Sequence, residues 1–193
     1  LRQNLNDCLK TRFVYDGPNV VMELNGSNEV VCAYVNGLGV DQPIERIDFI
    51  NGTARGQQVF HADSLGSIAA LTDGQGSLIQ TYAYEAFGKL RAQSGINLNR
   101  VTFTAREALG DSLDFVYYRN RIVSASTGRF TSEDPQGFID GPNRYVYCGN
   151  NPMRYRDPFG KECDPLCAQY RALVNVAASG ALSNQTQNLH LAN

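Results

Sequence analysis

Short apolar runs, each closed by a turn signal, constrain the fold of this chain more than any other feature. Four such runs are residues 19–24, 29–35, 67–72 and 77–84. Asn25-Gly26 separates the first two runs, and Asp73-Gly74 lies between the last two. Asn-Gly and Asp-Gly pairs tolerate positive φ and are strong hairpin signals between β-like runs. The sequence therefore predicts a mainly β protein built of hairpins.

A short motif recurs along the chain: an aromatic residue or His, then an acidic residue, then a glycine. It occurs at residues 15–17, 61–66 and 84–88. Asp63 and Glu85 lie 22 residues apart, about one hairpin per period. Such repeats bury their faces against neighbours, so one repeat is not stable alone. We expect stacked β-hairpin repeats over residues 1–112, continuing a longer sheet upstream.

Composition limits the kinds of partner. Of the 193 residues 42% are hydrophobic, enough for one domain with a core. A net charge of −2 and a pI near 5.7 give no basic surface for nucleic acid. No apolar run reaches the roughly 18 residues of a membrane-spanning helix. We expect neither nucleic acid nor a membrane span, and the start at Leu1, without Met or a signal peptide, predicts a piece of a longer polypeptide.

The cysteines are odd in number and lack tight paired spacing. They are Cys8, Cys32, Cys148, Cys163 and Cys167. Cys163 and Cys167 would give a metal half-site, with only His61 and His190 to complete it. The simpler interpretation is that all five are small buried or free thiols. We expect no metal and no cofactor.

The last part of the chain, residues 161–193, changes character. Asp164-Pro165 precedes apolar residues at helical spacing, and Gly180 ends the pattern. Asp at the N-cap, Pro at the first helical position and a terminal Gly predict one short helix. We therefore expect a variable tail with a short helix.

The sequence Asp-Pro-x-Gly occurs twice, at residues 134–137 and 157–160. Proline presets the second turn position, and glycine permits the chain reversal. Runs at residues 114–122 and 144–148 predict two further strands, and the second lies between the two turns.

Asp134 and Asp157, which begin these turns, are candidates for a catalytic pair. Two close carboxylates cannot both ionise cheaply, so one would activate a water while the other holds a proton. The alternative is that each carboxylate only hydrogen-bonds within its own turn. Arg129 and Arg156 are candidate charge partners, because an arginine can orient a carboxylate through a bidentate contact. Arg129 could instead form a salt bridge on an exposed strand.

A combination of motifs resembles the Rhs (rearrangement hotspot) or YD-repeat family, in particular its Rhs-associated core domain. The motifs are Phe103-Thr104, Tyr117-Tyr118-Arg119-Asn120-Arg121, Thr127-Gly128-Arg129-Phe130, Ser132-Glu133-Asp134-Pro135, Asn143-x-Tyr145-x-Tyr147, Gly149-Asn150-Asn151-Pro152 and Asp157-Pro158-x-Gly160. Residues 61–67 and 84–88 look like the repeats upstream of that core, so the match covers roughly residues 12–160.

This resemblance implies a hollow β shell wound from YD repeats and closed at one end by the core, residues 113–160. Members of the family are large secreted or delivered bacterial proteins, often with a variable, toxic C-terminal segment sequestered in the shell. The implied partners are the upstream YD repeats of the same longer chain and its own C-terminal segment. The implied location is secreted, extracellular or delivered by a bacterial secretion system.

The leading hypothesis is therefore structural: a core that closes a β cage around a C-terminal segment. In many bacterial members the core is also an aspartyl autoprotease that cuts after the final Asp-Pro-x-Gly. Carried to this chain, the resemblance implies catalytic Asp134 and Asp157, with Arg129 preferred because it matches the Gly-Arg-Phe motif, and a cut between Gly160 and Lys161. Members that cleave usually have an apolar residue after this glycine. This chain has Lys161 there, and a lysine fits an apolar subsite poorly.

A third hypothesis concerns the ten tyrosines of the chain. Alternating exposed tyrosines could bind glycans in an extracellular adhesion module, although tyrosine is also a common strand residue that packs within sheets.

Overall fold

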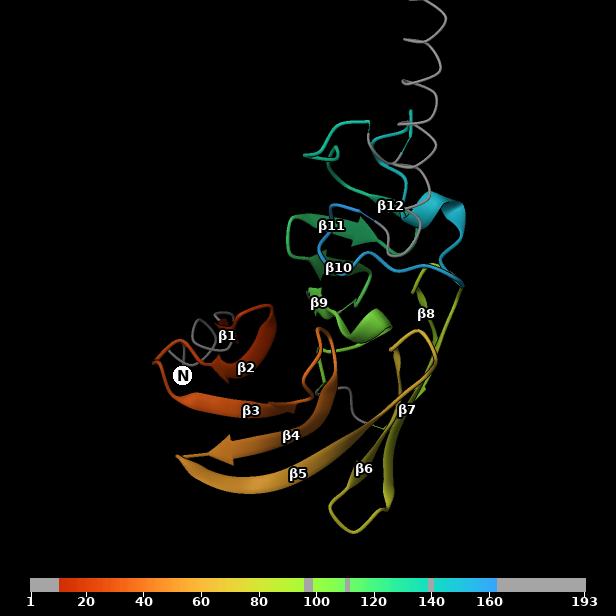
Figure 1. Cartoon of the computed structure of the whole chain (residues 1–193). Helices are drawn as coiled ribbons and strands as arrows, with labels where there is room; N and C mark the ends of the chain where they lie inside the picture. Colours follow the sequence, from red (N-terminus) through yellow and green to blue (C-terminus); the bar gives the residue numbers. More distant parts are fainter. Residues whose placement is uncertain (1–10, 96–98, 110–111, 139–140, 163–193) are drawn as a thin grey trace, which may run out of the picture. The chain divides into compact units, whose positions relative to one another are not determined.

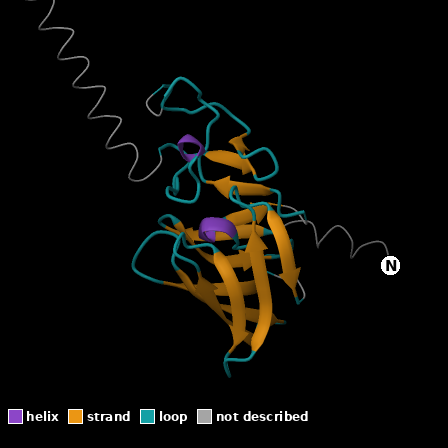
Figure 2. Cartoon of the chain, turned by 90° about the vertical axis from the view of Figure 1, so that its right-hand side faces the viewer, coloured by secondary structure: helices purple, strands orange, loops and turns teal. Residues whose placement is uncertain are grey.

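The computed structural model describes residues 11–95, 99–109, 112–138 and 141–162. In these ranges the regular structure is almost all β-strand, with two short 3-10 turns, η1 (Phe103–Ala105) and η2 (Cys148–Asn150) (Figure 2). The mainly β fold class predicted from the sequence is confirmed. No helix in the described ranges has the length and apolar character that crossing a membrane requires.

The chain divides into two compact units, residues 1–117 and 118–193, which are described separately. The predicted domain boundaries at 112/113 and 160/161 stay predictions. The helix expected from Asp164 lies outside the described residues.

Eight strands of the first unit form one antiparallel sheet in chain order, so each strand pairs with its sequence neighbours (Figure 1). They are β1 (Arg12–Asp16), β2 (Asn19–Leu24), β3 (Val30–Asn36), β4 (Pro43–Ile50), β5 (Thr53–Ala62), β6 (Ile68–Asp73), β7 (Leu78–Tyr84) and β8 (Leu90–Ser94). The four runs predicted from periodicity correspond to β2, β3, β6 and β7 within one residue at each end. Their β-branched and aromatic residues suit a pleated, half-buried surface.

Three of the loops between these strands share one hydrogen-bond pattern. Asp63 Oδ1 accepts the amide N–H groups two and four residues ahead, both at 2.9 Å. Asp73 Oδ1 does the same at 3.0 and 2.8 Å, and Asn25 Oδ1 at 3.0 and 2.9 Å. Gly66 and Gly76, three residues after the acid, have φ of 84° and 85°. Asn25-Gly26 is therefore the start of a longer side-chain-capped loop, not a two-residue turn.

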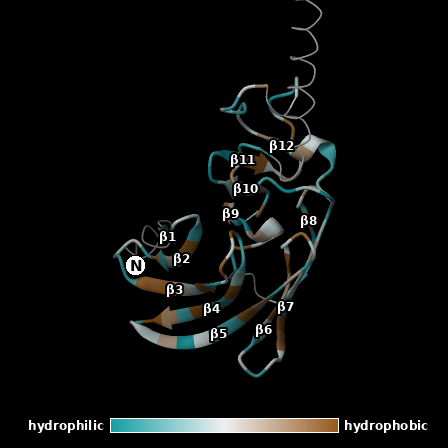
Figure 3. Cartoon of the chain, in the orientation of Figure 1, coloured by the Kyte–Doolittle hydropathy of each residue, from teal (hydrophilic) through white to brown (hydrophobic). Residues whose placement is uncertain are grey.

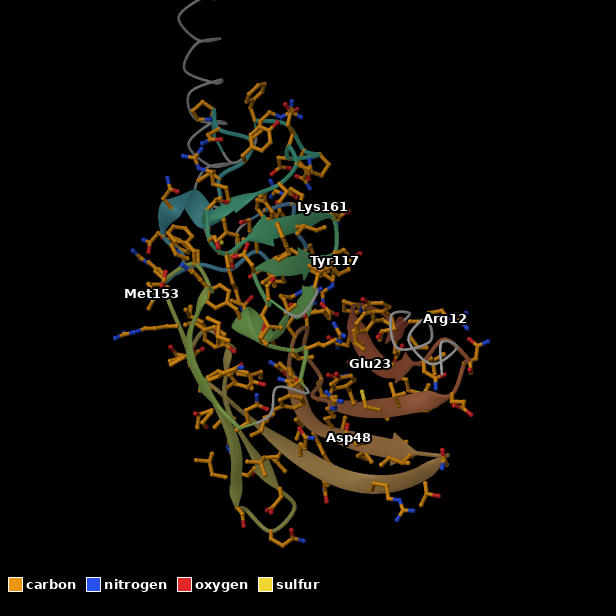
Figure 4. All side chains as sticks on the ribbon, turned by 180° about the vertical axis from the view of Figure 1, so that it is seen from behind. Arg12, Glu23, Asp48, Tyr117, Met153 and Lys161 are labelled. Atoms are coloured by element: carbon orange, nitrogen blue, oxygen red, sulfur yellow. The ribbon has the colours of Figure 1, made fainter. Side chains whose placement is uncertain are left out.

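A polar row crosses the buried face of this sheet. The register places Glu23, Cys32 and Asp48 opposite one another on β2, β3 and β4 (Figure 4 labels Glu23 and Asp48). The Tyr34 hydroxyl donates to Glu23 Oε1 at 2.5 Å, and Arg46 Nε donates to Asp48 Oδ1 at 2.7 Å. Burial raises the pKa of the Cys32 thiol to about 12, so Cys32 is a protonated, buried thiol as predicted.

The apolar part of the core continues along the same unit. Its buried members are Val20, Cys32, Tyr34, Phe60, Ile68, Leu71, Tyr82, Val101 and Ala105. Figure 3 shows the hydrophobic colour along β3. The segment around η1 packs on the sheet, since the Ile68 N–H donates to the Thr102 carbonyl and the Thr104 N–H donates to Ser67 Oγ, each at 3.0 Å.

Arg106 fastens this segment through a buried ion-pair cluster. Its Nη1 contacts Asp41 Oδ1 at 2.7 Å, and its Nη2 contacts Glu107 Oε2 at 2.6 Å. Its Nε donates to the Tyr117 carbonyl at 2.9 Å. The contact with Asp41 spans 65 residues of sequence, so it ties the end of the unit to the β3–β4 loop.

The remaining strands of the described residues are β9 (Glu107–Leu109), β10 (Phe115–Tyr118), β11 (Arg121–Ser124) and β12 (Arg129–Phe130). Strand β9 pairs with β10, and β11 pairs with β12. The predicted strand 114–122 is wrong in one respect, because the chain reverses at Arg119 and Asn120. Arg119 has a φ of 59°, a left-handed conformation that a continuous strand cannot contain. The prediction of a strand at 144–148 is also wrong: Val146 forms one isolated bridge, and η2 follows.

Most tyrosines of the described residues pack inside the units. In the second unit the Tyr118 and Tyr147 rings lie 5.3 Å apart, with the Phe130 ring 6.1 and 5.7 Å from them. Tyr15 and Tyr145 are the exposed tyrosines of the described ranges. The glycan-binding hypothesis therefore has few exposed rings to rest on there.

Two glycines have the same backbone conformation but different surroundings. Substitutions at them therefore measure the cost of backbone strain separately from the cost of packing. Gly76 and Gly88 have φ of 85° and 89°, but a Cβ on Gly88 would lie 2.5 Å from the Phe103 ring, whereas one on Gly76 meets nothing within 4 Å. We expect Gly76→Ala to lower the free energy of unfolding by about 1–2 kcal/mol through backbone strain. Gly88→Ala should cost a further ~1–3 kcal/mol because Phe103 must move. Urea denaturation measures both losses, and equal losses would contradict this packing.

Candidate functional site

The two Asp-Pro-x-Gly turns place their carboxylates inside the second unit. The Gly137 N–H donates to the Asp134 carbonyl at 3.0 Å, and the Gly160 N–H donates to the Asp157 carbonyl at 3.3 Å. The two glycines have φ of 80° and 63°. Both turns thus resemble the loops that begin at Asp63 and Asp73, where a glycine also follows three residues after the acid, and both aspartates are buried.

One oxygen of each carboxylate serves its own turn. Asp134 Oδ1 accepts the Gln136 N–H at 2.8 Å. Asp157 Oδ1 accepts the N–H groups of Lys161 at 3.0 Å and Glu162 at 3.2 Å. Each aspartate therefore forms hydrogen bonds within its own turn, which was the alternative to a catalytic pair. These hydrogen bonds use only the Oδ1 atoms.

The other oxygen of each carboxylate binds Arg121. Arg121 Nη1 lies 2.9 Å from Asp134 Oδ2, and Nη2 lies 3.0 Å from Asp157 Oδ2. The guanidinium carbon lies 3.5 Å from the centroid of the Phe130 ring, and the Arg121 side chain is only 2% exposed. A planar fork with several fixed donors suits such a double contact. One guanidinium thus joins carboxylates that are 23 residues apart in the sequence.

The Gly160–Lys161 peptide bond lies within this cluster. Arg121 Nε donates to the Gly160 carbonyl oxygen at 2.6 Å, while Asp157 Oδ1 accepts the N–H of the same peptide bond. Figure 4 labels Lys161. Nε and Nη2 form one edge of the guanidinium, so Asp157 shares an edge with the Gly160 carbonyl and Asp134 binds at the remaining nitrogen.

Charge in the cluster is unbalanced, because two carboxylates face one guanidinium. Burial raises the pKa of Asp157 to about 6, and the Lys161 N–H and Arg121 oppose this shift. Uptake of one proton would leave the cluster neutral, which a low-dielectric interior favours. Asp157 is thus the carboxyl of the pair that is suited to hold a proton near neutral pH.

Arg144 connects the first turn to the segment that follows it. The Asp134 N–H donates to the Arg144 carbonyl, and Arg144 Nη2 donates to the Asp134 carbonyl, both at 3.0 Å. Arg144 Nη1 also forms a half-exposed ion pair with Glu133 at 2.5 Å. These contacts bring residue 144 alongside the Asp134 turn without a regular strand.

The structure brings four of the five predicted site residues together: Asp134, Asp157, Gly160 and Lys161. The ion pairs of both aspartates go to Arg121, whereas Arg129 is exposed in β12. The role predicted for Arg129 stays a prediction. Arg121 was missed because it lies within the run 114–122, which predicts one continuous strand. The reversal at residues 119–120 has no glycine to mark it in the sequence, because its left-handed residue is Arg119.

A metal centre is not visible in the part of the chain that the structure describes, where His, Cys, Asp and Glu do not gather in groups of three suited to an ion. Cys163 and Cys167 lie outside the described residues. His61 is exposed, and its Nε2 lies 3.0 Å from Thr72 Oγ1.

Comparison with known proteins gives sequence relatives among bacterial toxins and nucleases. The tRNA nuclease WapA of Bacillus subtilis (strain 168) is 29% identical over 159 residues, which are 78% of this chain and 6% of WapA. Toxin subunit YenC2 of Yersinia entomophaga is 32% identical over 93 residues, which are 46% of this chain and 9% of YenC2. The chain thus spans less than a tenth of the length of these curated relatives. No family model matches the chain.

Solved structures share the fold. The crystal structure of TcdB2-TccC3-Cdc42 matches with a TM-score of 0.63 at 21% identity, over 78% of this chain and 8% of that chain. TcdB2-TccC3 without its hypervariable C-terminal region matches with a TM-score of 0.62 at 22% identity, over 82% and 8%. The chain is therefore related in sequence to toxin subunits and WapA nucleases and has the β fold of part of the Tc toxin complexes. These relations are consistent with an Rhs-type protein.

The raised pKa of Asp157 predicts a pH dependence of stability. The native state binds this proton below about pH 6, whereas an ordinary aspartate has a pKa of 3.8. Its stabilising contribution is therefore complete below pH 3.8 and is lost as the pH rises through about 6. Between pH 7.5 and 5.0 we expect a gain of about 1 kcal/mol that Asp157→Asn lacks.

Urea denaturation of the unaltered chain and Asp157→Asn at the two pH values measures this difference. Asp16→Asn, at an exposed position, is the control for loss of a carboxylate. A stability difference between the unaltered chain and Asp157→Asn that does not change with pH would contradict the assignment.

Proposed function

We propose that this chain is the closing core of an Rhs-type β shell, and that it shields a segment following Gly160 in a secreted or delivered toxin-type protein. In this proposal the partners of the core are YD repeats upstream in a longer chain. The main support for the proposal is the antiparallel sheet in chain order, followed by the buried cluster of Arg121, Asp134 and Asp157. This cluster holds residues 157–162 in place.

Two further features support this proposal. One matched structure is that of TcdB2-TccC3 without its hypervariable C-terminal region, and a region of that kind parallels a variable segment after the core. Among the described residues, β1 is the terminal strand in the sheet order, so its outer edge suits pairing with a preceding repeat.

Protease protection of a C-terminal epitope tag tests the shell in the longer parent chain. We expect the tag to resist proteinase K in the unaltered protein and to be digested at least tenfold faster in Arg121→Met. Removing the cation leaves two carboxylates buried without their partner, which typically costs about 3–5 kcal/mol. Arg154→Met, at an exposed position, is the matched control. A tag digested equally fast in all three proteins would rule out the shielding role.

Autoproteolysis at the Gly160–Lys161 bond is the second candidate, and one specific observation favours it. Arg121 binds the carbonyl oxygen of that bond, and Asp157 binds its N–H. A cation on the carbonyl oxygen stabilises the negative charge that develops there when water attacks.

The proposed reaction has one hydrolytic step with balanced proton transfers. Ionised Asp134 accepts a proton from the attacking water, whose oxygen bonds to the Gly160 carbonyl carbon. Protonated Asp157 gives its proton to the Lys161 nitrogen as the C–N bond breaks. The products are a carboxylic acid at Gly160 and an amine at Lys161, and transfer of the acid's proton to the amine leaves a carboxylate and an ammonium group. Transfer of a proton from Asp134 to Asp157 restores the starting state of the pair. An acid with a pKa near 6 suits this task around neutral pH.

Intact-mass spectrometry of freshly purified chain tests this reaction. We expect fragments of residues 1–160 and 161–193, and only the intact mass in Asp134→Asn and Asp157→Asn. Arg121→Lys should slow cleavage by on the order of 100-fold, because one donor replaces a fork. If Arg129 is the charge partner instead, Arg129→Lys will slow cleavage more than Arg121→Lys does. A single intact species in every protein would refute autoproteolysis. The cluster would then have a structural role only.

A further inference from the structure

Three consecutive side chains bind three consecutive carbonyl groups beside the candidate cleavage site. Arg119 Nη1 donates to the Pro158 carbonyl, Asn120 Nδ2 donates to the Phe159 carbonyl at 2.8 Å, and Arg121 Nε donates to the Gly160 carbonyl at 2.6 Å. Arg119 and Asn120 form the reversal between β10 and β11, and Arg121 is the first residue of β11. The bond assigned to cleavage follows the third carbonyl directly.

The reversal presents these side chains in a fixed order. Arg119 has a φ of 59°, and the Asn120 N–H donates to the Tyr118 carbonyl at 2.6 Å. The Arg119 guanidinium carbon also lies 5.1 Å from the centroid of the Phe159 ring. Arg119 thus contacts both a carbonyl and a side chain of the segment, and Asn120 adds a neutral hydrogen bond between two charged neighbours.

Close packing at Gly160 restricts the register independently. A Cβ at this position would lie 2.3 Å from the Tyr118 carbonyl oxygen and 3.0 Å from the Arg121 nitrogen. A slip by one residue would bring Phe159 or Lys161 against the same backbone atoms. It would also shift every carbonyl away from its donor, so the hydrogen bonds and the packing select the same register.

We propose that Arg119 and Asn120 are positioning residues that fix the register of residues 158–160, so that Arg121 receives the Gly160 carbonyl and no neighbouring one. This inference rests on the proposed autoproteolysis. The three contacts lie on the Gly160 side of the bond, and the Asp157 contacts on the other side are to the backbone N–H groups of Lys161 and Glu162. The residues that precede the bond are therefore the ones that Arg119, Asn120 and Arg121 recognise.

Cleavage-site fidelity tests the inference. Arg119→Ala and Asn120→Asp should slow cleavage at Gly160–Lys161 by on the order of 10- to 100-fold, since small misplacements of reacting groups have effects of that size. Intact masses should also reveal cuts at neighbouring bonds. The pH midpoint of cleavage should not move, because Asp157 and Arg121 are unchanged, and Arg119→Lys should recover part of the rate.

Arg154→Ala is the matched control, because the Arg154 guanidinium carbon lies 5.3 Å from the centroid of the Tyr155 ring, a contact like that of Arg119 with Phe159. Its rate and cleavage site should equal those of the unaltered chain. Variants at Arg119 and Asn120 that cleave at one bond and at the normal rate would overturn the register role.

Hydrogen exchange separates failure of this inference from failure of autoproteolysis. In Arg119→Ala and Asn120→Asp the amides of residues 157–162 should exchange several-fold faster than in Arg154→Ala. Unchanged exchange in a chain that cleaves would overturn the positioning role alone. If the unaltered chain never cleaves, autoproteolysis fails and the register role fails with it, whatever the exchange shows.

Discussion

The guanidinium of Arg121 is the interaction on which the second unit depends. Its three nitrogens contact Asp134, Asp157 and the Gly160 carbonyl, and its flat face lies on Phe130. Burying a cation is expensive unless its donors are paired, so the surrounding chain must supply acceptors at fixed positions. The two Asp-Pro-x-Gly turns do this, and residues 157–162 are held as a consequence.

The first unit uses the same solution with different residues. Arg106 lies buried between Asp41 and Glu107, and it binds the Tyr117 carbonyl as Arg121 binds that of Gly160. Both arginines join segments far apart in the sequence, which hydrophobic packing alone does not place in one orientation. The difference is chemical: in the Arg121 cluster the guanidinium donates to the carbonyl oxygen of a peptide bond, and the Asp157 carboxylate accepts from the N–H of the same bond, which gives the cluster a candidate reaction.

The acid-x-x-glycine turn explains how a structural element can acquire such a site. In the sheet of the first unit, Asp63 and Asp73 use one carboxylate oxygen to cap their own loops. Asp134 and Asp157 keep that capping contact, and their second oxygens bind Arg121. A loop-capping acid thus becomes half of a buried pair when a buried cation lies beside it.

The sequence by itself determined the hairpins and the turns, because alternation and turn residues act over a few neighbours: β2, β3, β6 and β7 follow directly from it. It also indicated both aspartates and the Gly160–Lys161 bond. It did not determine the break at Arg119, because the left-handed residue there is an arginine and not a glycine. Nor did it reveal Arg121 as the shared cation, since that depends on which side chain is buried between turns 23 residues apart. Only tertiary structure decided those points, because a buried charge chooses its partners through space and not along the chain.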